Sequence, residues 1–304
     1  MKHPFRGVGT ALVTPFQAGG ALDEKALRRL LRRQIRAKID FLVPLGTTGE
    51  AAVLDESEYF RVVEICLEEA AGRVPVLVGA GSNNTARAVY LTRRLQQMGA
   101  SGTLQVVPFY SKPTQEGQYR HFREIAQATP LPVIVYNIQG RTGVNMATST
   151  LMRLAEVDNI VGVKEASGVF NQVLEVLQRR PPGFVVLSGD DVWTLPIIAC
   201  GGDGVVSVLS NLAPQRTKKL ADAALAGNLD LARRLHNQLL TLVNTLFIET
   251  NPIPVKTALS VLGLMQEQFR LPLVPMQPDN RKRLLEVMRE AGVLKGVGEG
   301  GGRE

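Results

Sequence analysis

The chain of 304 residues has few cysteines and histidines, and each scarcity excludes a class of protein. Its two cysteines, Cys66 and Cys200, are too few for a disulfide scaffold, and their apolar helical surroundings predict small buried residues in a reducing cytoplasm. Its three histidines, His3, His121 and His236, lack metal-ligand spacing, so no metal site is expected. No apolar run approaches the ~18 residues of a membrane span, which argues against a membrane protein.

Motifs of several large enzyme classes are also missing. The sequence has no H-E-x-x-H, C-x-x-C, P-loop or G-x-S-x-G pattern, which disfavours metal hydrolases, nucleotide enzymes and serine hydrolases. Gly296, Gly298 and Gly301 match G-x-G-x-x-G, but no strand precedes them and no helix follows. We attribute that match to chance.

Charge is present in excess of one sign, with 35 Lys and Arg against 28 Asp and Glu and a net charge of +7. Much of the excess lies between Lys25 and Lys38, where leucines recur at helical spacing. This pattern predicts an amphipathic helix with a solvated basic face. Nucleic-acid binding is not expected, because no aromatic residues alternate with the basic ones and no docking motif is present.

Short apolar runs alternate regularly with helical patterns. Continuous apolar runs are typical of parallel strands covered by helices on both faces, and eight such units close a (β/α)₈ TIM barrel. An open doubly wound sheet is the alternative, because periodicity does not reveal closure. The expected strands are Val8–Thr14, Phe41–Leu45, Pro75–Gly79, Gly102–Val107, Pro132–Tyr136, Ile160–Lys164, Phe184–Ser188 and Gly204–Val208. The expected helices begin near Asp23, Asp55, Thr85, Gln115, Thr148, Phe170, Val192 and Pro214.

The alternation stops near residue 227, which predicts three parts. Residues 1–227 are expected to form the barrel that carries the active site, and residues 228–295 a small C-terminal helical extension. Residues 296–304 are Gly-rich and expected to be disordered. Helical patterns in the extension are Leu229–Phe247, Val255–Leu264 and Asn280–Glu290.

Catalytic groups of a barrel gather where its strands end, and Lys164 ends an apolar run. Its ammonium would emerge into a partly desolvated barrel mouth. Desolvation lowers the pKa of a lysine and frees the amine to attack a carbonyl carbon and form an imine. The alternative is that Lys164 pairs with Glu165 or extends to water.

Other strand ends supply hydroxyl groups and a guanidinium. Thr47 and Thr48 lie between two glycines whose backbone N–H groups can form a nest for a carboxylate. Tyr110 and Tyr136 can donate and accept protons, and a Tyr–Thr–Tyr chain can carry a proton to water, unless the two rings only fill the barrel mouth. The planar fork of Arg141 suits a carboxylate, with a surface ion pair as the alternative.

Nine motifs together carry a family resemblance that runs from Gly7 to Leu294. They are Gly46–Glu50, Pro108–Tyr110, Lys112–Gly117, Tyr136–Asn137, Arg141–Gly143, Gly162–Ala166, Leu187–Asp191, Gly204–Ser207 and Asn251–Lys256. In these residues the chain resembles the dihydrodipicolinate synthase (4-hydroxy-tetrahydrodipicolinate synthase) family. This family belongs to a pyruvate-aldolase superfamily that also includes N-acetylneuraminate lyase.

The resemblance implies a lyase of lysine and diaminopimelate biosynthesis. Lys164 would form a Schiff base with pyruvate, and the derived enamine would attack L-aspartate 4-semialdehyde, so that cyclisation yields 4-hydroxy-tetrahydrodipicolinate. Tyr136 would be the proton donor and acceptor, with Thr47 and Tyr110 as its relay. No dissociable cofactor or metal is implied, since the lysine supplies the electron sink.

The resemblance also assigns binding residues and an assembly. Thr48 would hold the pyruvate carboxylate, Val206 would line the pyruvate pocket through its backbone, and Gly189 belongs to the same substrate-binding set. Arg141 would bind the carboxylate of the aldehyde substrate. The relay tyrosine of this family crosses a dimer interface, which implies a homo-oligomer that is at least a dimer and usually a tetramer.

The chain departs from the family pattern in two places. Gln139 and Gly140 stand where a Pro-Ser pair usually precedes the Arg-Thr-Gly motif, and losing the rigid proline is expected to loosen the loop that aims Arg141. The departure is therefore expected to affect specificity for the second substrate.

The second departure concerns feedback by lysine. Arg87, Tyr59 and Phe109 stand at three positions where lysine-inhibited relatives carry acidic, hydroxyl-bearing or imidazole groups, whereas Asn83 is kept. A guanidinium repels the ammonium of lysine, so weak or absent inhibition is expected.

Two other functions compete with the synthase. A lyase that cleaves a 2-oxo sugar acid, of the N-acetylneuraminate or 2-keto-3-deoxygluconate type, would share Lys164 and Tyr136. The paired threonines, Tyr110 in its loop and Arg141 favour the synthase. A catalytically idle barrel is a different class, which would bind a 2-oxo acid or, through its basic face, a polyanion. The intact lysine, tyrosine and threonine set argues against it.

Overall fold

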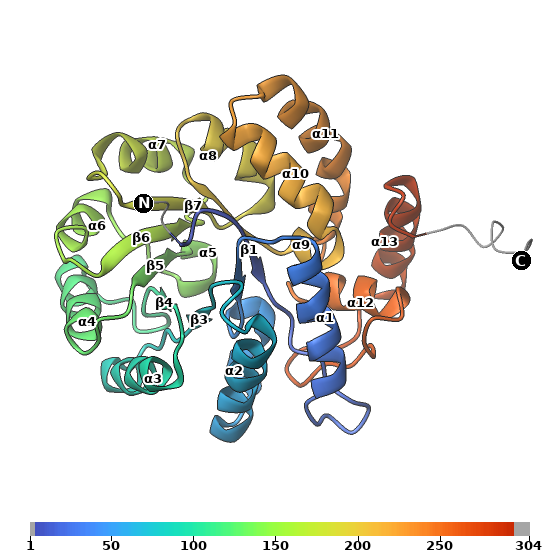
Figure 1. Cartoon of the computed structure of the whole chain (residues 1–304), viewed down its shortest axis with the longest axis horizontal. Coiled ribbons are helices and arrows are strands. Elements are labelled where there is room, and N and C mark those ends of the chain that lie inside the picture. Colours follow the sequence, from blue (N-terminus) through green and yellow to red (C-terminus); the bar gives the residue numbers. More distant parts are fainter. Residues whose placement is uncertain (1–3, 295–304) are drawn as a thin grey trace, which may run out of the picture.

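The structure is a computed structural model that describes residues 4–294, so the predicted Gly-rich tail lies outside the described residues. Figure 1 shows the strands at the centre with helices arranged around them. All strand pairs are parallel, in the order β2-β1-β8-β7-β6-β5-β4-β3. The two ends of this order are joined by a parallel bridge from Leu42 to Val76 and by a hydrogen bond from the Gly79 N–H to the Pro44 carbonyl (2.9 Å). The predicted (β/α)₈ barrel is therefore confirmed, and the open sheet is excluded.

All eight predicted strands are present, with some shifts at their ends. The first apolar run continues past its strand, because Leu12–Thr14 are buried beyond the end of β1. The strands are β1 (Gly7–Ala11), β2 (Phe41–Val43), β3 (Leu77–Gly79), β4 (Gly102–Val106), β5 (Val133–Asn137), β6 (Ile160–Glu165), β7 (Val185–Ser188) and β8 (Gly204–Ser207).

The predicted helices follow their strands. Asp55 caps the helix that was predicted to begin near it, and Glu58 completes a capping box with it. The barrel helices are α1 (Glu24–Arg36), α2 (Glu56–Ala70), α3 (Thr85–Met98), α4 (Gln115–Gln127), α6 (Thr148–Leu154), α7 (Phe170–Arg179), α8 (Thr194–Ala199) and α10 (Pro214–Leu225). Short elements that the sequence pattern does not reveal are η1 (Thr47–Gly49), η2 (Ala51–Val53), α5 (Gln139–Thr142), η3 (Asp191–Trp193) and α9 (Leu209–Leu212).

Three longer helices follow the barrel: α11 (Leu229–Thr245), α12 (Ile253–Val261) and α13 (Pro278–Glu290). They pack against it through one continuous hydrophobic core, in which Val255 and Leu284 join Val205 and Leu220 of the barrel. In Figure 1 they lie on the side of α1 and α10. The division of the chain at residue 227 stays a prediction.

The interior of the barrel is packed below its catalytic end. Buried side chains from most strands form one cluster, which includes Leu77, Leu104, Ile134, Leu187 and Val206. Strands that point alternate residues inward bring such residues together only in a closed barrel. This packed layer forms the floor on which the strand-end residues stand.

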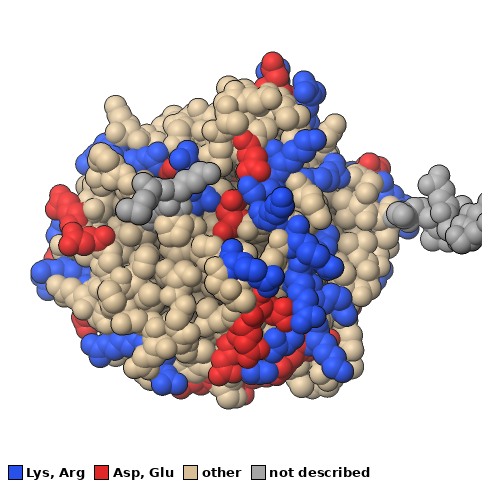
Figure 2. Space-filling view, viewed as in Figure 1, with Lys and Arg blue, Asp and Glu red and all other residues tan. Residues whose placement is uncertain are grey.

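The basic helix predicted near the N-terminus is α1, and its charges are partly paired. Figure 2 shows basic side chains over α1 beside acidic ones over the neighbouring α2. Arg32 donates to both carboxylate oxygens of Glu69 (2.8 Å each), and Arg61 of α2 reaches back to Glu24 (2.8 Å). The basic excess of this surface is therefore smaller than the sequence indicates.

The predictions for the two cysteines have different outcomes. Cys66 is buried in α2 as expected, but Cys200 is exposed just after α8, so the prediction was wrong for Cys200. The helix ends there, and its last residue, Ala199, is exposed as well.

Within residues 4–294, no helix is long and apolar enough to cross a membrane, and no cluster of potential metal ligands occurs.

Gly204 lies opposite Gly7 where β8 pairs with β1, so a substitution there tests the packing that closes the barrel. Its φ is +150°, and a Cβ there would lie 1.9 Å from the Gly7 carbonyl oxygen. Gly204→Ala is therefore expected to lower the free energy of unfolding by about 2 kcal/mol, measured by urea denaturation. Gly19→Ala, where an added Cβ meets nothing within 4 Å, is the control. Equal midpoints for both variants would contradict the prediction.

Candidate active site

Lys164 lies near the end of β6 with only 7% of its surface exposed. Its Nζ is 3.9 Å from the centroid of the Tyr136 ring, because β5 and β6 pair with these two residues in register. Burial lowers the pKa of Lys164 to about 7, a shift that the charge of Asp191 opposes and that of Arg141 reinforces. A substantial fraction of the amine is therefore neutral and nucleophilic near pH 7.

The alternative pairing of Lys164 with Glu165 is not what the chain adopts. Successive residues of a strand point to opposite faces, and Glu165 accepts hydrogen bonds from the Ser167 N–H (2.6 Å) and the Asn137 amide (3.3 Å). Burial raises the pKa of the Glu165 carboxyl. Lys164 is thus left to face the barrel mouth.

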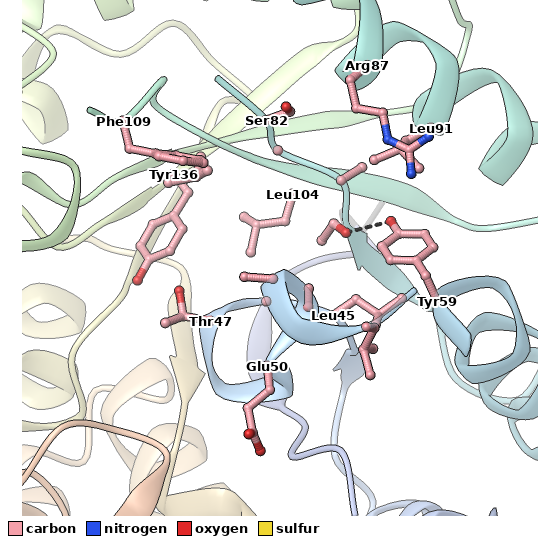
Figure 3. A pocket seen from close by; sticks show the side chains of 18 of the residues that line it. Leu45, Thr47, Glu50, Tyr59, Ser82, Arg87, Leu91, Leu104, Phe109 and Tyr136 are labelled. Carbon is pink, nitrogen blue, oxygen red and sulfur yellow. Dashed lines mark hydrogen bonds between the residues drawn. The ribbon is translucent and has the colours of Figure 1, made fainter. Parts of the chain in front are cut away.

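Tyr136 and Thr47 face each other across the barrel mouth, as Figure 3 shows. Burial raises the pKa of the Tyr136 phenol, while hydrogen bonding to Thr47 works in the opposite direction. Both residues also border a cavity of about 370 Å³ that extends towards α2 and α3. Lys164 contacts the Tyr136 ring but is not among the residues that line this cavity.

Gly189 and Val206 complete the surroundings of the lysine. Gly189 follows β7, and a Cβ there would approach the Cε of Lys164 to 3.2 Å and the Ala166 Cβ to 2.8 Å. The absence of a side chain at Gly189 therefore leaves space beside the amine. Val206 lies in β8, buried in the same cluster as Tyr136.

Thr48 and Arg141 are connected through one residue of the C-terminal helices. The Asn251 amide donates to the Thr48 hydroxyl oxygen (2.9 Å), and Arg141 donates to the Asn251 carbonyl (3.2 Å). The turn that carries Arg141 is closed by hydrogen bonds from its own N–H and that of Thr142 to the Ile138 carbonyl (3.1 and 3.0 Å). These bonds form the turn in the absence of the usual proline, and the expected loosening of the loop stays a prediction.

Tyr110 is the one predicted site residue that this chain does not bring to the others. Its side chain is 88% exposed, and its backbone takes a left-handed conformation with φ of 72°. An aromatic residue in that conformation is strained, and such strain gathers at functional sites. The neighbouring Phe109 borders the cavity.

Several residues escaped sequence reasoning although their motifs were recognised. Asp191 is buried and accepts hydrogen bonds from Ser207 (2.5 Å) and from the backbone N–H groups of Val208 and Leu209 (2.8 and 3.0 Å). Burial raises its pKa to about 6 against these bonds. The sequence signal that could have identified Asp191 is its place in an Asp-Asp pair that follows a predicted strand. The roles of Asn251 and its neighbours depend on contacts with distant parts of the chain, which leave no local pattern.

Three of the four positions that the family resemblance relates to lysine binding, Tyr59, Arg87 and Phe109, line the cavity. Tyr59 donates to the Gly79 carbonyl (2.7 Å), as drawn in Figure 3. Arg87 forms an ion pair with Glu56, which also accepts from Tyr90 (2.7 Å). The sequence reasoning missed Glu56. Because Arg87 is paired with the Glu56 carboxylate, the ammonium of a bound lysine would have to displace the Arg87 guanidinium to reach it.

Comparisons with known proteins agree on one family. The model of the Dihydrodipicolinate synthetase family matches residues 4–291. The chain is 50% identical over 291 residues to the 4-hydroxy-tetrahydrodipicolinate synthase of Koribacter versatilis (strain Ellin345), covering 95% of this chain and 97% of that one. Dihydrodipicolinate synthase from Aquifex aeolicus superposes with a TM-score of 0.94 at 44% identity, covering 96% and 100%. The chloride-inhibited enzyme from Acinetobacter baumannii, complexed with pyruvate, gives 0.93 at 39% identity, covering 95% and 99%.

The lowered pKa of Lys164 predicts unusual reactivity at neutral pH. Reductive methylation needs the neutral amine, so its rate at Lys164 is expected to rise with pH and reach half its maximum at about 7. Peptide mass spectrometry of short, limited reactions measures that rate at each pH, with exposed lysines of the same digest as references. A rate at Lys164 that still rises above pH ~9, as for an ordinary lysine, would contradict the prediction.

Proposed function

The chain belongs to the dihydrodipicolinate synthetase family and has 4-hydroxy-tetrahydrodipicolinate synthase activity, and from this premise we propose that Lys164 is its Schiff-base residue. The activity is that of a class I pyruvate-dependent lyase of lysine and diaminopimelate biosynthesis. The observation that carries the assignment is the buried Lys164 amine, whose pKa is lowered to about 7 and whose Nζ lies 3.9 Å from the Tyr136 ring centroid.

The reaction begins with attack of the neutral Lys164 amine on the ketone carbon of pyruvate. Loss of water gives an imine, whose positive nitrogen draws electrons from the methyl group. Removal of a methyl proton then leaves an enamine, and its carbon attacks the aldehyde of aspartate semialdehyde to form a carbon–carbon bond. The amino group of the second substrate finally attacks the imine carbon, which closes the ring and releases Lys164 unchanged.

Tyr136 would carry the protons in these steps. Its hydroxyl lies on the side of the ring that faces Thr47, and the strand register holds the ring against Lys164. Burial raises the pKa of this phenol, so it stays protonated at rest and can donate to a leaving hydroxyl. Thr47 would pass the proton onward to Tyr110.

Two groups would hold the substrate carboxylates. The Thr48 oxygen already accepts a hydrogen bond from Asn251, which leaves its hydroxyl hydrogen for the pyruvate carboxylate. Arg141 offers a fork for the carboxylate of aspartate semialdehyde, and its contact with the Asn251 carbonyl directs it to the barrel mouth. Val206 and Gly189 would border pyruvate, the valine through its backbone.

The proton relay would be completed by a second copy of the chain. Tyr110 is 88% exposed, although its proposed role requires a place beside Thr47 of a closed site. A second chain packed against this face would bury Tyr110 and bring it to the partner's relay. The active assembly is therefore proposed to be at least a dimer, usually within a tetramer, working in the cytoplasm.

Borohydride trapping tests the Schiff base directly. Pyruvate and borohydride are expected to add mass to the peptide of Lys164, whereas Lys164→Met shows no gain. Tyr136→Phe keeps the ring but removes the proton carrier, so kcat is expected to fall about 10²- to 10⁴-fold while the trapped adduct still forms. The assay pairs pyruvate with aspartate semialdehyde, and N-acetylneuraminate and 2-keto-3-deoxygluconate serve as competing cleavage substrates. No mass gain at Lys164 in the parent protein would end the proposal.

Feedback by lysine is expected to be weak or absent. Arg87 repels the lysine ammonium and occupies Glu56, the nearby carboxylate. Initial rates measured against increasing lysine should stay nearly constant at sub-millimolar concentrations. Arg87→Ala frees Glu56 and is expected to bind lysine more tightly than the parent. A parent activity that halves at sub-millimolar lysine would show that the Arg87–Glu56 pair does not block the ligand.

A further inference from the structure

One short segment of the C-terminal helices, residues 251–256, contacts both groups that the proposed function assigns to substrate carboxylates. The side-chain amide of Asn251 donates to the Thr48 hydroxyl, and its backbone carbonyl accepts a hydrogen bond from Arg141. Lys256, in the first turn of α12, forms an ion pair with Glu50 at the end of the Thr47–Thr48 loop. A segment outside the barrel strands thus reaches this loop at two points.

Lys256 is enclosed on every side. It is fully buried, and its Nζ lies 4.5 Å and 5.1 Å from the ring centroids of Phe16 and Phe269. Glu50 is 5% exposed and adopts a left-handed conformation with φ of 52°. In Figure 3 its carboxylate points away from Thr47 and Tyr136, so the ion pair lies behind the loop and not in the reaction space.

Stability alone is a weak reason for this pair. Removing two charges from water costs much of what their attraction returns, and apolar replacements of similar volume are often equally stable. Burial raises the pKa of Glu50 and lowers that of Lys256, and the opposite charge of the partner counters both shifts. One Glu50 oxygen, Oε2, has no hydrogen-bond partner within the described residues. The ion pair does fix the position of Glu50, the residue that ends the Thr47–Thr48 loop.

We propose that Lys256 is a positioning residue: through Glu50 it holds the loop at the depth where Thr48 meets a substrate carboxylate and Thr47 meets Tyr136. The C-terminal helices would then act on catalysis from behind the loop, without touching the substrate through Lys256. The inference rests on the proposed function for the identity of that substrate, pyruvate.

The experiment separates positioning from stability with three variants. Lys256→Met leaves Glu50 as an unpaired buried charge. The double variant Glu50→Met/Lys256→Met removes both charges and keeps linear side chains of similar size. Arg281→Met, the control, breaks an ion pair with Glu267 (3.0 Å) among the C-terminal helices. The thermal midpoint, the KM for pyruvate, kcat and borohydride trapping at limiting pyruvate are measured for each.

Lys256→Met is expected to lose stability, and the double variant to regain most of it. The double variant should nevertheless keep a KM for pyruvate raised about tenfold or more and trap less adduct at limiting pyruvate, because a displaced loop misplaces Thr48. Arg281→Met should keep the parent KM. A double variant with the parent KM would overturn the proposal. If the double variant remains unstable, the KM for pyruvate is measured below its thermal midpoint and is judged by the same criterion. Absence of trapping in the parent would instead refute the proposed function.

Discussion

The site depends on burying one amine at the end of a parallel strand. β6 carries Lys164 into a barrel mouth that excludes water, and this desolvation lowers its pKa to about 7. The register between β5 and β6 sets the Tyr136 ring against the same amine. The proposed nucleophile and the proposed proton carrier are thereby placed by the pairing of two neighbouring strands. The loops around them need only supply binding groups.

Those binding groups come from segments far apart in the chain. Thr48 follows β2, Arg141 lies in α5, and Asn251 of the C-terminal region bonds to both. The barrel therefore provides the proposed reactive pair, Lys164 and Tyr136, and the C-terminal region contacts the groups proposed to bind the substrate carboxylates. Tyr110 has no such internal support. Its exposure and left-handed backbone are explained if a second chain completes the site.

Local patterns predicted much of this and missed what is formed at a distance. Lys164, Tyr136 and the paired threonines were found because each ends or follows an apolar run, and strand ends meet at one face of a barrel. The Arg87–Glu56 pair was missed because its members belong to α3 and α2. The buried partner of Glu50 lies in α12, and no spacing in the sequence relates the two. Cys200 was misjudged, since an apolar neighbourhood in sequence does not reveal where a short helix ends.

The sequence by itself determined the eight βα units, the strand-end residues and the family, because hydrophobic period and motif are local properties. Closure of the barrel, the pKa of Lys164 and the pairing of charges were decided only by the tertiary structure. Each of these depends on which distant groups exclude water or lie within a few ångströms. The basic segment that dominates the charge count illustrates the difference. In the fold, Arg32 of that segment is paired with Glu69, whereas burial lowers the pKa of Lys164, the proposed nucleophile.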